Sequence, residues 1–141
     1  MICYLDTSLL VTALTGEVAA ARVLAWFGKR PSDRLAISDW VVTEFAAALS
    51  VKLRTRQLTP EARAAVAAQF AAIRSETLET LPVFGEHFRA AARFADQAPL
   101  GLRAGDALHV AIAAEHGATI CTLDKRLAEA ATALAVSTEL V

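Results

Sequence analysis

The alternation of short strand-like runs with longer helical stretches constrains the fold of this chain more than any other feature. The strand candidates are Ile2–Leu5, Leu35–Ile37, Ala118–Thr122 and Leu134–Ser137, with Thr77–Pro82 more polar because of Glu79 and Thr80. Short runs that are apolar throughout are typical of strands buried on both faces of a parallel sheet. The pattern therefore predicts an α/β fold, with a central, mostly parallel sheet of about four or five strands and helices on both faces.

Helical periodicity fills the segments between these runs. A proline directly after Thr59 matches a capping residue followed by proline in the first turn, so residues 40–74, approximately, are expected to form a helical hairpin. The expected helices are Leu9–Thr15, Glu17–Gly28, Val41–Arg56, Pro60–Arg74, Phe84–Gln97, Leu102–His116 and Lys125–Ala131.

Length and composition narrow the class of protein. At 141 residues, with no linker or repeat, the chain is expected to be one domain over residues 1–141. It lacks the ~18-residue apolar run that spans a bilayer and begins without a basic, cleavable leader, so we expect a cytoplasmic protein with no membrane partner. Cys3 and Cys121 match no metal-binding spacing and are expected in the core.

The net charge of −1 excludes a protein that binds nucleic acid through strong overall basicity. It does not exclude an enzyme that acts on nucleic acid, because a local basic rim is enough to guide a substrate.

Four acidic residues stand where the predicted fold would bring them together. Asp6 follows the first strand and Asp124 follows the fourth, so both lie at the carboxyl edge of the sheet, where open α/β folds bind their ligands. Glu44 and Asp106 lie in the helices that adjoin this edge. Asp106 is also near a helix start, where the helix dipole alone favours an acid.

Converging carboxylates need a counter-charge, because unit charges 4 Å apart repel by about 4 kcal/mol at an effective dielectric of 20. A site of carboxylate oxygens without histidine or cysteine favours Mg²⁺ or Mn²⁺ over Zn²⁺. Such an ion can activate water and neutralise charge developing on phosphorus. The acidic set therefore indicates phosphodiester hydrolysis.

Four sequence blocks also resemble a known family. They are Leu5–Leu9 (LDTSL), Thr43–Glu44 (TE), Leu102–His109 (LRAGDALH) and Thr122–Leu127 (TLDKRL). In this order they are similar to the PIN-domain ribonucleases, and specifically to the VapC-type toxins of bacterial toxin–antitoxin pairs.

The resemblance implies a PIN-like domain and a metal-dependent endoribonuclease that uses Asp6, Glu44, Asp106 and Asp124. Asp6 and Asp106 would bind Mg²⁺ or Mn²⁺ directly. Glu44 would bind the metal or orient the attacking water, and Asp124 would act through water. The hydroxyls of Thr7, Ser8 and Thr122 would support these acids. The family also implies an RNA substrate, a cognate antitoxin and a homodimer.

Other polar and aromatic residues keep more than one interpretation. Lys52, Arg54 and Arg56 contact RNA or antitoxin, or form a solvated helix end. Arg103, three residues before Asp106, either contacts a phosphate of the substrate or has no role in binding it. His109 is expected to pack beside the acids more readily than to bind metal. His87 and His116 are expected on the surface. Trp26 and Trp40 are expected in the core or a dimer interface rather than as platforms on which RNA bases stack.

Rival functions make different demands on the sequence. A PIN-fold RNA-processing nuclease without an antitoxin needs the same acids. A haloacid-dehalogenase-type enzyme needs a second aspartate two residues after the first, where Ser8 stands. A non-catalytic, receiver-like metal-binding module needs an isolated lysine after a late strand, whereas Lys125 directly follows Asp124.

Overall fold

The computed structural model describes residues 1–141 and contains one five-stranded parallel sheet. The strand order is β3-β2-β1-β4-β5, and all four pairings are parallel. This confirms the predicted α/β class. The strands are β1 (Ile2–Leu5), β2 (Arg34–Ser38), β3 (Glu79–Leu81), β4 (Thr119–Thr122) and β5 (Thr138–Leu140).

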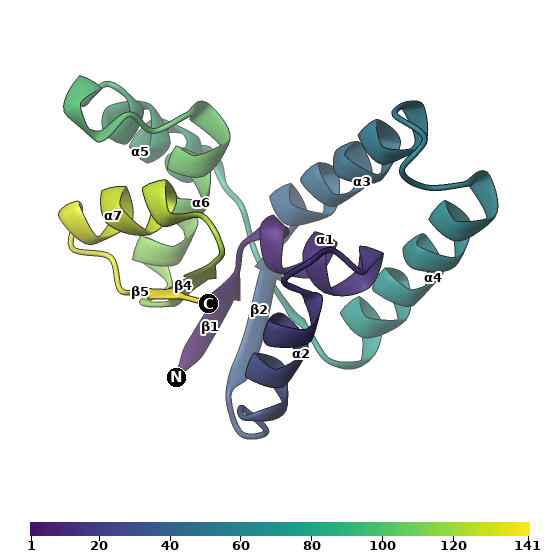
Figure 1. Cartoon of the computed structure of the whole chain (residues 1–141). Coiled ribbons are helices and arrows are strands. Elements are labelled where there is room, and N and C mark those ends of the chain that lie inside the picture. The colour runs from purple at the N-terminus through teal and green to yellow at the C-terminus, as the bar shows by residue number, and fades with distance from the viewer.

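Helices cover the sheet in two groups. The first four pack against one another on one side of the sheet, and the last three lie on the other side (Figure 1). The helices are α1 (Thr7–Thr15), α2 (Ala20–Gly28), α3 (Asp39–Arg54), α4 (Pro60–Glu76), α5 (Gly85–Ala95), α6 (Ala104–Glu115) and α7 (Lys125–Ala133), with a short 3₁₀ turn at Ala98–Leu100.

The central strands explain the continuous apolar runs in the sequence. β1 and β4 are neighbours, covered by helices on both faces, and Cys3, Leu5, Ile120 and Cys121 are fully buried. Both cysteines are free thiols in the core, as predicted.

The hairpin of α3 and α4 lies where the sequence predicted it. Thr59 accepts a hydrogen bond from the Ala62 amide through its hydroxyl, and Pro60 opens α4. Thr59 therefore satisfies an amide in the first turn of α4, where Pro60 has no amide hydrogen to satisfy.

The prediction of a last strand at Leu134–Ser137 is wrong. α7 continues to Ala133, and Ala135 then adopts a positive φ of 60°, so this segment is a turn. The strand itself is Thr138–Leu140, paired with β4. An edge strand is half exposed and needs few apolar residues, so hydrophobicity locates it poorly.

No single helix of the chain is long and apolar enough to cross a membrane. Only α1 and α2 taken together, with a 111° bend between them, reach that length and composition.

The order of the strands creates one switch point. From β1 the chain proceeds outward through β2 and β3, and it then returns to the other side of β1 for β4 and β5. The carboxyl ends of β1 and β4 therefore meet where the strand order reverses, which is the usual ligand position in open α/β sheets.

Candidate active site

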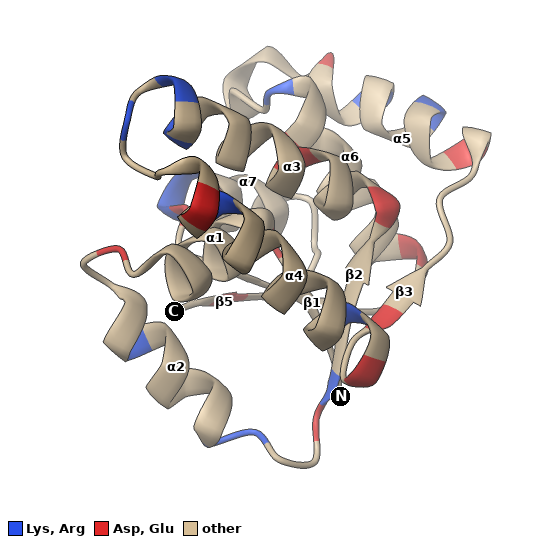
Figure 2. Ribbon diagram, turned by 90° about the vertical axis from the view of Figure 1, so that its right-hand side faces the viewer, with Lys and Arg blue, Asp and Glu red and all other residues tan.

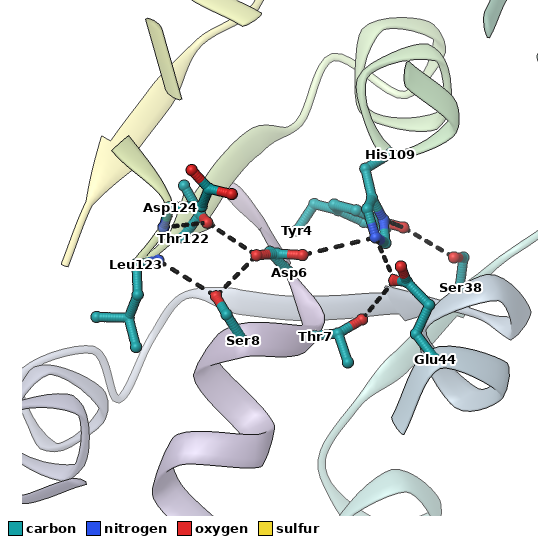
Figure 3. A network of polar contacts seen from close by, with 10 residues as sticks. All are labelled: Tyr4, Asp6, Thr7, Ser8, Ser38, Glu44, His109, Thr122, Leu123 and Asp124. Carbon is teal, nitrogen blue, oxygen red and sulfur yellow. Dashed lines mark hydrogen bonds and ion pairs between the residues drawn. The ribbon is translucent and has the colours of Figure 1, made fainter. Parts of the chain in front are cut away.

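Asp6 lies at this switch point, between the end of β1 and the start of α1. Its amide donates a hydrogen bond to the carbonyl of Cys121, so the β1–β4 hydrogen bonding continues one residue past the end of β1. Its Oδ2 accepts hydrogen bonds from the hydroxyls of Ser8 (2.7 Å) and Thr122 (2.8 Å) (Figure 3). The side chain is buried with one oxygen held, and Oδ1 faces His109 at 3.5 Å.

Glu44 reaches the same place from α3. Its Oε1 accepts a 2.7 Å hydrogen bond from the hydroxyl of Thr7 and lies 2.5 Å from Nε2 of His109. Burial alone would raise the pKa of Glu44, but the hydrogen bonds and charge of His109 and the hydroxyl of Thr7 outweigh it and lower the pKa. Glu44 is therefore an ionised acid at neutral pH.

His109 stands between the acids and the core. It is fully buried on α6, and its Nδ1 lies 2.9 Å from the hydroxyl of Tyr4. Burial alone would lower the pKa of His109, but the hydrogen bond to Glu44 and the charges of Asp6, Glu44 and Asp106 raise it.

Asp106 lies in the first turn of α6 and is half-buried. Burial raises the pKa of Asp106, and the nearby charges of Asp6, Asp124 and Glu44 raise it further, against the opposing charge of His109. The other three predicted acids are therefore all close enough to act on Asp106. Ionising Asp106 in this setting costs free energy unless a cation is present.

Asp124 is more exposed and also caps a helix. Its Oδ1 accepts hydrogen bonds from the amides of Arg126 and Leu127 at the start of α7. Its own amide donates to the hydroxyl of Thr122, the group that also holds Asp6. A small cavity of about 30 Å³ lies between Asp124 and Asp106, with Arg103 also on its wall.

The donor atoms suit a hard divalent cation. Ligand atoms of Asp6, Glu44 and His109 lie within 4.8 Å of one another, and Asp106 lies close enough on α6 for the charges of Asp6 and Glu44 to act on it. Both Asp6 and Glu44 have one carboxylate oxygen held by hydroxyls and the other oxygen free of hydroxyl bonds. Oxygen ligands held in this way are typical of Mg²⁺ and Mn²⁺ sites.

The family model for the PIN domain matches residues 3–133, nearly the whole chain. The chain belongs to the PIN domain family. The match confirms the family to which the four sequence blocks pointed.

Solved structures share the fold of this PIN domain. VapBC2 of Rickettsia felis, bound to a promoter DNA fragment, matches at a TM-score of 0.71 and 17% identity, covering 99% of this chain and 98% of that one. VapC20 of Mycobacterium tuberculosis, a toxin that cleaves the sarcin–ricin loop, matches at 0.72 and 17%, covering 91% and 94%. VapBC-5 of the same organism matches at 0.60 and 26%, covering 99% and 97%. No curated protein matches the chain.

The predicted basic residues at the end of α3 lie apart from the four acids of the candidate site. Lys52 pairs with Glu17 at 2.7 Å, and Arg54 donates to the Ser50 hydroxyl. They lie about 12–15 Å along α3 from Glu44, close to the loop that joins α3 and α4 (Figure 2). Arg103, in contrast, lines the cavity beside Asp106.

Tyr4 and Ser38 belong to the site but carried no sequence signal. Tyr4 stands in a strand whose apolar pattern indicates core, and Ser38 ends the neighbouring strand. The fold alone brings Tyr4 to His109 and Ser38 to Tyr4. The prediction that His87 is a surface residue is wrong. His87 is only 1% exposed, because α5 and α6 pack together and its ring is stacked between Phe84 and His116. His116 is half-buried.

Proposed function

We propose that this PIN domain is a Mg²⁺- or Mn²⁺-dependent endoribonuclease, and that it acts as the toxin of a toxin–antitoxin pair. The observation that carries the proposal is the close approach of Asp6 and Glu44 at the switch point of the sheet, with Asp106 near enough for both charges to act on it. No lysine or arginine forms an ion pair with any of the three. Such a site has the charge and the ligands for a hard cation.

The four acids would have different roles in catalysis. Asp6 and Asp106 would hold the metal, Glu44 would bind it or orient the attacking water, and Asp124 would act through water from the rim. Thr7, Ser8 and Thr122 would fix the carboxylates on which this depends. When bound, the metal would supply a Lewis acid that activates water and stabilises charge on the phosphodiester.

Arg103 supports RNA as the substrate. Its side chain is exposed on the wall of the cavity that separates Asp106 from Asp124, where it can meet a phosphate without neutralising either acid. Lys52, Arg54 and Arg56 would contact RNA or antitoxin only at the far end of the α3–α4 hairpin.

Partners follow from the same proposal. Several structural neighbours were solved as VapBC or FitAB assemblies, which supports a cognate antitoxin here. We also propose a homodimer. Phe84 and Phe88 are each more than half exposed at α5, which supports a protein interface on that helix. Light scattering coupled to gel filtration tests this, and a monomer at micromolar concentration contradicts it.

Incubation with total RNA tests the catalytic proposal. Purified protein and its Asp106→Asn variant are incubated with Mg²⁺, with Mn²⁺ and with EDTA, and the RNA ends are mapped. The proposal expects discrete fragments that require the metal and are absent with the variant. Fragments that persist in EDTA, or equally with Asp106→Asn, would contradict it.

A further inference from the structure

We propose that a buried chain of hydrogen bonds, from Ser38 through Tyr4 to His109, positions the carboxylate of Glu44. This inference rests on the proposed function for its catalytic consequence. It makes Tyr4 and His109 positioning residues, because both act on the reaction only through Glu44.

The contacts form one unbroken path. The hydroxyls of Ser38 and Tyr4 lie 2.8 Å apart, the hydroxyl of Tyr4 lies 2.9 Å from Nδ1 of His109, and Nε2 of His109 lies 2.5 Å from Oε1 of Glu44. The path begins in β2, crosses β1 and α6, and ends on α3, as Figure 3 shows. Four separate elements are thus joined at one carboxylate.

The direction of the last bond is fixed by chemistry. The carboxylate of Glu44 can only accept, so Nε2 of His109 must carry a proton and donate it. In the neutral ring Nδ1 then accepts from the hydroxyl of Tyr4, which in turn accepts from Ser38. If both ring nitrogens are protonated, the bonds beyond the ring reverse while the bond to Glu44 keeps its direction.

This direction decides between two roles for His109. A metal needs a free lone pair on nitrogen, and Nε2 has none while it donates to Glu44. While this bond is made, Nε2 of His109 is therefore not available to a metal, although it lies near Asp6 and within the cluster of possible ligand atoms. It holds one oxygen of Glu44, together with Thr7, and leaves the second oxygen for metal or water.

Burial explains why the path can position a side chain. Ser38, Tyr4 and His109 are each fully buried, whereas the side chain of Glu44 is 29% exposed. Buried polar groups keep one arrangement, because breaking any link leaves a donor or acceptor unpaired without water to replace it. The path therefore transfers the rigidity of the core to a residue at the edge of the site.

Four variants test the role. His109→Leu removes the donor, His109→Gln restores an amide donor at a similar reach, and Tyr4→Phe removes only the middle link. His87→Gln is the matched control, because His87 is also a buried histidine. Its Nδ1 accepts a hydrogen bond from the Phe84 amide and its Nε2 pairs with Glu115, so it contacts none of the four acids of the site. The readouts are kcat and KM for RNA cleavage, with folding checked by circular dichroism.

We expect His109→Leu to lower kcat by about 10–100-fold with little change in KM, as for groups that orient a ligand. His109→Gln should recover most of this loss, Tyr4→Phe should lose an intermediate amount, and His87→Gln should retain full activity. Equal loss in the Leu and Gln variants, or full activity in Tyr4→Phe, would overturn the role. If His109→Leu does not fold, the Gln and Phe variants decide.

A nitrogen-15 NMR spectrum of the histidine rings separates this inference from the proposed function. We expect the Nε2-bound proton of His109 to be visible in wild type and to shift in both Tyr4→Phe and Glu44→Gln. This result would support the hydrogen-bonded path even if the protein cleaved no RNA. A His109 signal unchanged in both variants would overturn the path itself.

Discussion

The carboxylate of Asp6 accepts a 2.8 Å hydrogen bond from the hydroxyl of Thr122, which lies 116 positions further along the chain. The bond joins the carboxyl ends of β1 and β4, the two strands on either side of the switch point. Because the same hydroxyl accepts from the amide of Asp124, one threonine fixes both predicted strand-end acids. The two strand-end acids of the site are therefore joined to each other through the sheet.

Thr122→Val should weaken the site while keeping the shape of the side chain. The hydroxyl is buried, so its loss leaves an oxygen of Asp6 and the amide of Asp124 without this partner. We expect a loss of about 1–3 kcal/mol of unfolding free energy and about 10–100-fold weaker metal binding. Thr55→Val at the exposed end of α3 is the control. Unchanged metal affinity in Thr122→Val would contradict the role of this bond.

Asp106→Asn should separate activity from stability. The pKa of Asp106 is raised by burial and by the neighbouring acids, so the metal-free protein gains when this charge is removed. We expect the melting temperature in EDTA to hold or rise while RNA cleavage is lost, a pattern common at functional sites. Differential scanning calorimetry measures this. A clear drop in melting temperature would make Asp106 a structural acid.

The pH dependence of stability should report His109. Because the folded pKa of His109 is raised above its unfolded value of about 6.5, its stabilising effect is complete below that pH. The effect is lost as the pH rises through the folded pKa. Urea unfolding in EDTA should therefore show a stability that declines above about pH 6.5 in wild type. If the stability of His109→Gln declined by the same amount over this pH range, the decline would come from titratable groups other than His109.

Gly105 should prove intolerant of a methyl group. A Cβ at this position would lie 3.2 Å from the ring of Trp40 and 3.3 Å from Oε2 of Glu44. We expect Gly105→Ala to displace Glu44 and lower RNA cleavage. Gly28→Ala, with nothing within 4 Å of the new atom, should be neutral or gain about 0.5–1 kcal/mol. Full cleavage activity in Gly105→Ala would show that Glu44 has room to move.

The sequence predicted the parts of the site that depend on local pattern. Asp6 and Asp124 follow strands, and parallel pairing brings such positions to one edge of a sheet. Asp106 starts a helix, and the structure places it near both. The match to the PIN domain model then confirmed the family that the four blocks indicated.

What could not be predicted depends on packing between distant elements. Tyr4 has the pattern of a core residue, and only the tertiary packing of β1 with α6 brings its hydroxyl to His109. His87 was misplaced for the same reason, because the contact between α5 and α6 that buries it leaves no periodic signal. The last strand was misplaced because an edge strand needs little apolar surface.

Calorimetric titration with Mn²⁺ tests the central claim most directly, because it measures the metal site without needing to know the RNA. Wild type, Asp106→Asn and Asp39→Asn are compared, the last being a control acid that is exposed at the start of α3. We expect saturable binding in wild type and in Asp39→Asn, and binding weaker by at least about 10-fold in Asp106→Asn. Equal affinity in all three proteins, or no saturable binding in wild type, would contradict a metal centre at these acids.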